Sequence, residues 1–196
     1  MDVIFQNCVK ITLCVGISSS FTAVLYKYFY KEEIKVVFFY GNSVNINHTF
    51  DINSINVQNC DCSNCKLNII LGWINSAKYT LDICMCILTN ETISKAIINA
   101  HKRGICIRII VDEDTLKTTW EMGREGIAKK VKSKIYSESI MHHKFTIVDD
   151  KKVILGSLNW TKMGTRKNWE NTFITNNRDI IAEYKKEFLK LWNGNI

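Results

Sequence analysis

The spacing of apolar residues predicts alternating strands and helices from residue 35 onward. Lys35–Tyr40 is a short β-branched and aromatic run that ends at a Gly-Asn pair, as a buried strand does. Apolar residues at helical spacing follow over 67–74 and again over 93–100, and apolar strand patterns come after them at 79–88 and 105–111. This alternation is typical of an α/β fold.

The second half of the chain is dominated by short strands and one closing helix. Strand patterns occupy 144–148, 153–155 and 172–175, with a turn at 149–151 between the first two. The closing helix, 178–192, has an apolar face made of Ile181, Tyr184, Phe188 and Leu191. We therefore expect a mixed sheet covered by helices on both faces.

The N-terminal segment has the composition of a membrane anchor. Residues 11–26 are apolar apart from a small polar centre, and the basic and aromatic residues of 27–31 follow, as at a cytoplasmic membrane interface. A cleaved signal peptide and a buried first helix are the alternatives, and no basic region precedes the apolar stretch to support the former. We expect residues 1–31 to anchor the chain and residues 32–196 to form one folded domain.

Composition narrows the class of protein. The chain has 196 residues, 46% of them hydrophobic, which suits one compact domain and excludes a disordered or collagen-like chain. The formal charge of +7, from 26 Lys and Arg against 19 Asp and Glu, favours polyanionic partners such as nucleic acid or anionic lipid.

Two short polar segments carry the residue types of a phosphodiester site. His142 and Lys144 project from the same face of a predicted strand, whereas His143 should face the other way as a structural histidine. An ammonium can hold a phosphate oxygen while an imidazole attacks phosphorus, and Ser157 and Asn159 can bind the remaining oxygens. These residues predict phosphodiester chemistry that needs no metal.

The two segments also carry a family resemblance. The pattern His-x-Lys-x4-Asp from His142, followed by Gly-Ser-x-Asn from Gly156, resembles the signature of the phospholipase D superfamily. Residues 141–161, Glu170, the Cys-rich segment and the N-terminal segment resemble in particular its single-motif, Zucchini-like branch of mitochondrial cardiolipin hydrolases. The resemblance implies a phospholipase D-like mixed sheet flanked by helices on both faces, with residues 32–196 as the catalytic domain.

The resemblance also implies a role for each site residue. His142 would form a phosphohistidine intermediate that water resolves, with Lys144 in the same catalytic set. Glu170 would orient His142 through its other ring nitrogen, as a triad carboxylate does. Asp149 belongs to the family's catalytic set, although we expect it to brace the end of the strand.

Most superfamily members carry two such motifs, and this chain has one. In-line displacement needs a nucleophile on one side of the phosphorus and a proton donor to the leaving oxygen on the other. A single His142 cannot occupy both places. A twofold homodimer with a shared active site would supply the second histidine.

A separate cluster has the spacing of metal ligands. Cys60, Cys62 and Cys65, with His48, make the four ligands that a structural zinc ion takes, and free cysteines are the alternative. The resemblance implies such a zinc-binding insert, which would be residues 41–66 here. Three further cysteines in apolar runs should be small core residues: Cys84, Cys86 and Cys106.

The chemistry of the site suits RNA and lipid alike, so the surface on which the substrate lies around the motif must discriminate between them. Cations that could follow a single strand surround the motif, although many should only be solvated surface. They are Lys102, Arg103, Arg108, Lys129, Lys130, Lys132, Lys134, Lys151, Lys152, Lys162, Arg166 and Lys167. Trp120, Trp160 and Trp169 could offer stacking faces, but we expect each to pack in the core.

The residues support three hypotheses of function. The first is a homodimeric, metal-independent endoribonuclease on single-stranded RNA, acting in piRNA biogenesis at the mitochondrial outer membrane with its domain facing the cytosol. The membrane address and the pathway come wholly from the resemblance. The second is a cardiolipin hydrolase that produces phosphatidic acid. The third, a non-catalytic RNA-binding scaffold, is disfavoured because the whole set of site residues is present.

Overall fold

The computed structural model describes residues 22, 31–41, 62–112 and 140–194. The chain divides into two compact units, Met1–Glu33 and Ile34–Ile196, and the second contains every strand and both motif segments. Of the predicted anchor only Thr22 and Lys31 are described, so the anchor stays a prediction. Within the described ranges, no helix combines the length and the apolar character that crossing a membrane requires.

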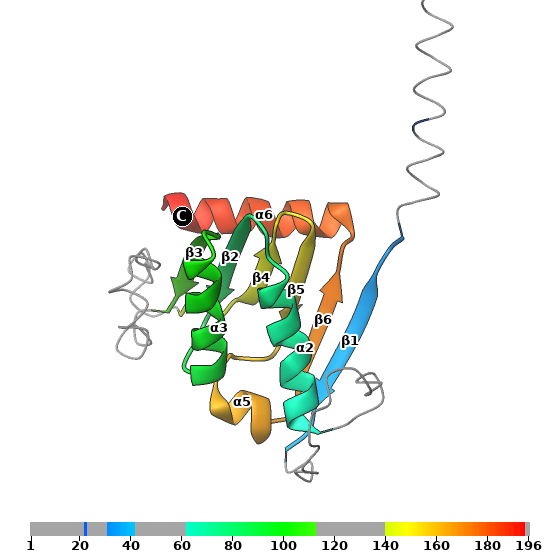
Figure 1. The fold of residues 1–196 in the computed structure, drawn as a ribbon, viewed down its shortest axis with the longest axis vertical. Coiled ribbons are helices and arrows are strands. Elements are labelled where there is room, and N and C mark those ends of the chain that lie inside the picture. The colour runs from blue at the N-terminus through cyan, green and yellow to red at the C-terminus, as the bar shows by residue number, and fades with distance from the viewer. Residues whose placement is uncertain (1–21, 23–30, 42–61, 113–139, 195–196) are drawn as a thin grey trace, which may run out of the picture. The chain divides into compact units, whose positions relative to one another are not determined.

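A mixed sheet of six strands lies at the centre of the second unit, in the order β1-β6-β5-β4-β2-β3 (Figure 1). The strands are β1 (Ile34–Phe39), β2 (Thr80–Met85), β3 (Cys106–Val111), β4 (Lys144–Val148), β5 (Lys152–Gly156) and β6 (Glu170–Thr175). β2 and β3 are parallel, because a helix carries the chain back between them, and the other neighbours are antiparallel. The predicted mixed sheet is confirmed.

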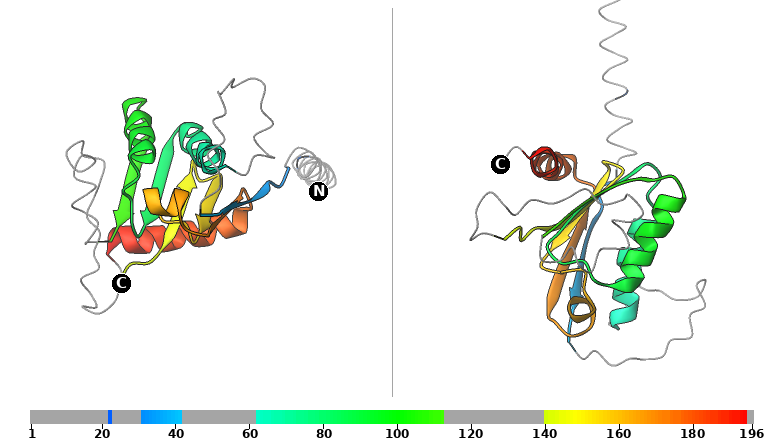
Figure 2. Two further views of the ribbon diagram at one scale, coloured as in Figure 1. Left: turned by 90° about the horizontal axis from the view of Figure 1, so that it is seen from below. Right: turned by 90° about the vertical axis from the view of Figure 1, so that its left-hand side faces the viewer.

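Helices cover both faces of the sheet. α2 (Ser63–Asn75) and α3 (Glu91–Lys102) lie on one face and α6 (Arg178–Asn193) lies on the other, so the unit has three layers (Figure 2). Asn90 caps α3 and Asn177 caps α6, each accepting two backbone N–H groups with its side chain, as N-cap residues do. A short helix that the pattern did not predict, α5 (Lys162–Arg166), lies at one end of the sheet (Figure 1).

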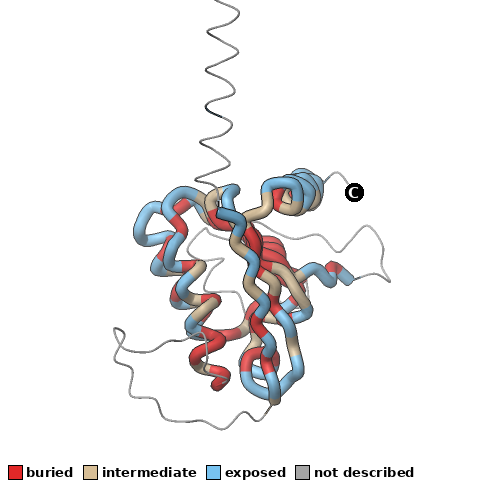
Figure 3. The backbone as a smooth tube through the Cα atoms, turned by 90° about the vertical axis from the view of Figure 1, so that its right-hand side faces the viewer, coloured by how far each residue is buried: buried red, intermediate tan, exposed pale blue. Residues whose placement is uncertain are grey.

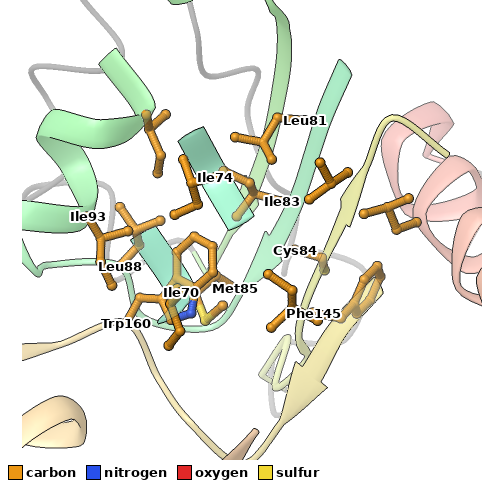
Figure 4. Packing of buried hydrophobic residues seen from close by; sticks show 14 of the residues in the cluster. Ile70, Ile74, Leu81, Ile83, Cys84, Met85, Leu88, Ile93, Phe145 and Trp160 are labelled. Atoms are coloured by element: carbon orange, nitrogen blue, oxygen red, sulfur yellow. The ribbon is translucent and has the colours of Figure 1, made fainter. Parts of the chain in front are cut away.

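The main core fills the space between the sheet and the helices α2 and α3 (Figure 4). Ile70 and Ile74 of α2 pack with Leu81 and Ile83 of β2, and all four side chains are fully buried. Burying a side chain of this size stabilises the fold by roughly 1.5–3 kcal/mol. Among the cysteines expected in the core, two are confirmed and one is wrong: Cys84 and Cys86 are buried, but Cys106 is exposed at the start of the edge strand β3.

A tight turn sets the pairing of β4 with β5. Asp149 and Asp150 both have positive φ, +53° and +52°, and Lys151 N–H donates to Val148 O at 2.9 Å, which is the pattern of a type I′ hairpin. Because Val148 then pairs with Lys152, the start of β4 comes to lie beside the end of β5.

The face under α6 holds a buried group of charges. Asp82 of β2 is 1% exposed and accepts two hydrogen bonds from Arg108 of β3, at 2.6 and 2.5 Å, and one from Lys185 of α6 at 2.8 Å. Lys185 also reaches Asp150 in the hairpin turn, at 2.5 Å. Burial alone would lower the pKa of Lys185, but its bonds to Asp150 and Asp82 outweigh this and raise it. Helix α6 is thereby tied to two strands and to the turn.

The cover of this face is incomplete at β1. Val37 and Phe39 are buried on the α2 side, whereas Ile34, Val36 and Phe38 are about half exposed or more on the other, so exposure alternates along the strand (Figure 3). Alternation of this kind is what a sheet with one covered face produces. Helix α6 packs against β4 and β5, and the apolar side chains on this side of β1 stay about half exposed or more.

Candidate active site

Both motif segments meet at one end of the sheet. β4 begins at Lys144 and the antiparallel β5 ends at Gly156, so the residues before β4 lie beside those after β5. β6, antiparallel to β5, begins at Glu170 and brings that carboxylate to the same end. Strand register, not proximity along the chain, assembles the site.

The histidine and lysine of the first segment stand at the open start of β4. Lys144 Nζ donates to His142 O at 2.9 Å, and Cys86 N–H from the end of β2 donates to His143 O at 2.8 Å. The backbone of the motif is therefore fixed on both sides. The His142 side chain is exposed, and its ring makes no hydrogen bond within the part of the chain that the structure describes.

His143 points to the other side of the strand, as its position predicts. Its ring lies edge-on to Phe145, with centroids 5.7 Å apart, and Nε2 is 3.5 Å from Glu187 Oε1 on α6. Phe145 in turn packs against Tyr184 of the same helix. His143 thus belongs to the packing of α6, and the expectation of a structural histidine on the opposite face is confirmed.

Gly156 permits a close approach of two strands at the site. Its φ is +154°, and a Cβ atom there would lie 2.3 Å from Asn171 O on β6, so only glycine fits. This approach lets Ser157 N–H donate to Asn171 O at 3.1 Å and Asn171 N–H donate to Ser157 Oγ at 3.0 Å. The glycine of the Gly-Ser-x-Asn segment therefore positions the serine.

Glu170 accepts hydrogen bonds at both carboxylate oxygens. Ser157 Oγ donates to Oε2 at 2.5 Å and Asn168 Nδ2 donates to Oε1 at 3.0 Å. Among the described residues no hydrogen bond joins Glu170 to His142, so here the carboxylate holds the serine hydroxyl. The expected orientation of His142 by Glu170 stays a prediction. The sequence did not indicate Asn168, because nothing in its spacing marks it as a partner of Glu170.

Asn159 presents an unusual polar atom. Its Oδ1 is buried, and no hydrogen-bond partner for it lies within the described part of the chain. Buried polar atoms in folded proteins almost always have a partner, and leaving one without costs about 1–3 kcal/mol. This unsatisfied acceptor belongs to the second motif segment, two residues after Ser157.

Asp149 is not brought to this end of the sheet. It follows β4, at the opposite end from His142, and its carboxylate accepts the backbone N–H groups of Lys78, Tyr79 and Thr80 at 2.7–3.2 Å. Burial alone would raise the pKa of Asp149, but these three bonds outweigh it and lower the pKa below its usual range. The structure gives Asp149 the bracing role and no contact with the site.

Only half of the predicted zinc ligands can be placed. Cys62 and Cys65 are buried at the start of α2, where Cys62 is the N-cap and its Sγ accepts Cys65 N–H at 3.3 Å, whereas His48 and Cys60 lie outside the described residues. In the described ranges there is no group of three or more metal-binding side chains. Two thiols one turn apart are compatible with a shared zinc ion, and the ligand set stays a prediction.

The tryptophans that could offer stacking faces differ in their exposure. Trp160 is 2% exposed and packs in the core as expected, but Trp169 is 79% exposed, so core packing is wrong for it. It precedes β6 at the end of the sheet, between polar residues and beyond the cover of the helices. Those polar neighbours in the sequence were the signal that could have indicated exposure. Trp120 lies outside the described residues.

The candidate phosphate-binding cations differ in whether they lie at the site. Arg108 is engaged by Asp82, and Lys151 and Lys152 lie over the rings of Tyr79 and Trp73. Lys102 and Arg103 end α3, away from the site. Residues 129–134 are not among the described ones. The cations left at the site are those on and after α5: Lys162, Arg166 and Lys167.

Comparison with known proteins agrees with this geometry. The protein called mitochondrial cardiolipin hydrolase in Danio rerio is 36% identical over 64% of this chain and 56% of its own length, so the match spans little more than half of that relative. Among solved structures, NucT from Helicobacter pylori has a TM-score of 0.61 and 25% identity over 82% of this chain and 97% of its own. The phospholipase D family member Nuc from Salmonella typhimurium has a TM-score of 0.63 and 22% identity over 83% and 95%, which shows the shared fold.

The family itself follows from the sequence profile described as cardiolipin synthase, PLD-like domain. That profile matches residues 70–192, which is more than half of the chain and includes both motif segments and Glu170. With a strand order that gathers the His-x-Lys and Gly-Ser-x-Asn segments at one end of a mixed sheet, the chain belongs to the phospholipase D-like family.

Proposed function

We propose that this protein is a phosphodiesterase in which His142 attacks phosphorus and forms a phosphohistidine intermediate. The observation that carries the proposal is the convergence of an exposed His142, the Lys144 ammonium and the hydrogen-bonded pair of Ser157 and Glu170 at one end of the sheet. Lys144 would neutralise a phosphate oxygen, and the side-chain N–H of Asn159 would donate to another phosphate oxygen. Glu170 and Ser157, which are hydrogen-bonded to each other, would hold the phosphate-binding groups in place.

The reaction needs a proton donor besides the nucleophile His142. In the first step the bond from a His142 ring nitrogen to phosphorus forms while the bond to the leaving oxygen breaks, and that oxygen takes a proton from another imidazole. In the second step water attacks phosphorus, gives its proton back to that imidazole, and the bond to His142 breaks. The partner's His142 in a twofold homodimer would supply the second imidazole.

Exposed apolar side chains near His142 favour a contact with a second copy of the chain there. Ile140 is 64% exposed two residues before His142, and Ile87 is 37% exposed next to Cys86, whose N–H bonds the motif backbone. Exposed apolar side chains that gather around one point mark interaction sites more often than chance. A second copy docking over the motif would bury them and complete the site.

Single-stranded RNA is the substrate we propose, in piRNA biogenesis at the mitochondrial surface, where an N-terminal anchor of residues 1–31 would hold the domain on the cytosolic side of the outer membrane. The pathway and the address rest on the resemblance to Zucchini-like proteins. The cations on and after α5, Lys162, Arg166 and Lys167, favour binding of a polyanionic strand at the site. A zinc ion held by His48, Cys60, Cys62 and Cys65 would be structural and separate from catalysis.

Cardiolipin hydrolysis to phosphatidic acid is the second candidate function. Two observations favour it: the name of the relatives, and the half-exposed apolar side of β1, which is suited to contact with acyl chains. An anionic lipid surface would also attract a chain of charge +7.

The test uses the full chain in detergent with excess chelator, end-labelled single-stranded RNA and cardiolipin micelles as rival substrates, and His142→Asn in parallel. Cleavage of RNA that falls at least about a thousandfold in the variant supports the nuclease. Turnover of cardiolipin with RNA intact would support the lipase instead, and inertness toward both would overturn the proposal.

The shared site has its own test, in which wild-type and His142→Asn chains are co-expressed in varied ratios. If each turnover needs two histidines, activity should fall as the square of the wild-type fraction. A linear decline would mean that each chain works alone.

A further inference from the structure

The most exposed large apolar side chain among the described residues stands at the site. Trp169 is 79% exposed, and its ring meets that of Tyr40 edge-on, with centroids 5.7 Å apart at 86°. Tyr40 in turn stacks with Phe38, at 6.4 Å. A lone apolar side chain on the surface needs no explanation, but three neighbouring aromatic side chains form a surface with a shape of its own. We call Phe38, Tyr40 and Trp169 the aromatic cluster.

The backbone holds this cluster in place. A Cβ atom at Gly41 would lie 2.1 Å from Lys167 O, so the end of β1 and the segment before β6 are in direct contact. Asn168 N–H and Lys167 N–H both donate to Met163 O of α5, at 3.1 and 2.8 Å. The rings are therefore presented by fixed elements, which lowers the entropy lost when a ligand binds.

The cluster lies at the same end of the sheet as the reacting groups, because Phe39 at the end of β1 pairs with Glu170 at the start of β6. Glu170, whose carboxylate holds Ser157, directly follows Trp169. Trp169 precedes β6, which β5 separates from β4, so a ligand that reaches both His142 and the Trp169 ring must extend along this end of the sheet, as a nucleic acid strand can. In a nucleic acid strand the group closest to each phosphate, apart from the sugar, is a base.

The charges around the cluster suit a polyanion. Between Gly156 and Asn171 the chain has three cations, Lys162, Arg166 and Lys167, and they are exposed. The one acid in that stretch is Glu170, which already accepts two hydrogen bonds. Exposed aromatic rings beside exposed cations are the combination with which proteins bind single strands without reading their sequence.

A membrane is a less suitable partner for Trp169. The residues on both sides of it, Asn168 and Glu170, are polar, and Asn171 is exposed as well. Inserting the ring into hydrocarbon would take these polar groups out of water, which is costly. A base stacked on the ring would leave them solvated.

We propose that Trp169, with Tyr40 against it, stacks on an unpaired base of the substrate strand where that strand leaves the active site, while Arg166 or Lys167 contacts a nearby phosphate. This inference rests on the proposed function as a single-strand nuclease and adds a base-stacking subsite to it. Because every base has a stacking face, the subsite would favour unpaired strands over duplexes and tolerate any sequence.

The test measures binding without cleavage, in full-length chains that carry His142→Asn, with a short single strand of RNA and a strand of equal length that lacks bases. A chain with Trp169 should bind the base-bearing strand about tenfold more tightly than the strand without bases. Trp169→Ala should abolish this preference and Trp169→Phe should retain most of it. Tyr79→Ala is the matched control, since Tyr79 is an aromatic residue 64% exposed at the opposite end of the sheet.

Equal preference in Trp169→Ala and the parent chain would overturn the inference, as would an equal loss of affinity for both strands. A Trp169→Ala chain, with His142 intact, that turns over cardiolipin more slowly but cleaves RNA at the normal rate would also overturn it, in favour of lipid contact. If the wild-type chain cuts no RNA, the proposed function fails. If it cuts RNA and the preference ignores Trp169, only the stacking subsite fails.

Discussion

The two ends of strand β4 have opposite characters. At its start His142 is exposed and its ring makes no hydrogen bond among the described residues, whereas at its end Asp149 accepts three backbone N–H groups. Beside that second end, Asp82 is 1% exposed and holds two cations. One five-residue strand thus joins an open, reactive end to a saturated, structural one. Substitutions at the two ends should therefore separate activity from stability.

The largest effect is expected at the open end. Lys144→Gln should lower kcat/KM on a chromogenic phosphodiester about 10²- to 10³-fold, because the ammonium stabilises charge on the phosphate in the transition state. The unfolding temperature should stay the same, since among the described residues the side chain hydrogen-bonds the backbone oxygen of His142 alone. Lys151→Gln, in the turn at the other end, is the control and should keep full activity. A Lys144→Gln chain with a tenth of wild-type activity would contradict the assigned role.

The next effect is expected at the closed end and on stability. Asp82→Ala leaves Arg108 and Lys185 without their shared carboxylate and should lower the free energy of unfolding by about 3 kcal/mol. Activity per folded molecule should be unchanged. Glu187→Ala removes only the 3.5 Å pair with exposed His143 and should cost under about 0.5 kcal/mol by denaturant titration. Equal costs for the two variants would remove the distinction between a buried network and a surface pair.

Asp149 should make stability depend on pH. Because folding lowers its pKa, its charged form stabilises the fold above its usual pKa of about 3.9, and the stabilisation is lost as pH falls through the lower, folded value. Asp149→Asn keeps a residue that tolerates positive φ and should cost about 1–2 kcal/mol at pH 7. Unfolding measured from pH 6 to pH 2 should show the difference from wild type shrinking toward the acid end. A constant difference would mean that the charge is irrelevant.

The smallest effect is expected at Ser157. Ser157→Ala removes the 2.5 Å bond to Glu170 and should lower kcat about tenfold, with less than about 1 kcal/mol lost in stability. Glu170→Gln tests the same contact from the other side. If Ser157 and Glu170 act as one unit, the double variant should be little worse than either single one. Fully additive losses would show that Ser157 and Glu170 act independently.

Local patterns predicted most elements because each depends on nearby residues. The strand predicted at 35–40, the turn at 149–151 and the helix at 178–192 follow from a short apolar run, polar turn residues and an apolar helix face, and the structure has them at 34–39, 149–151 and 178–193. Two residues escaped this reasoning. Cys106 lies in an apolar run and Trp169 is a large aromatic residue between polar ones, and both are exposed because the ends and edges of a sheet lose the cover that its centre has.

The α/β class, most element boundaries and the chemistry of the motif could be predicted from the sequence alone, since residue type and spacing along one segment specify them. Which residues meet was settled by the tertiary structure. Glu170 bonds Ser157, Asn159 Oδ1 is buried without a partner in the described part of the chain, and Asp149 lies at the far end of β4, all because of the order β6-β5-β4 and its register. Strand order and register depend on packing between distant segments, and local patterns carry no record of that packing.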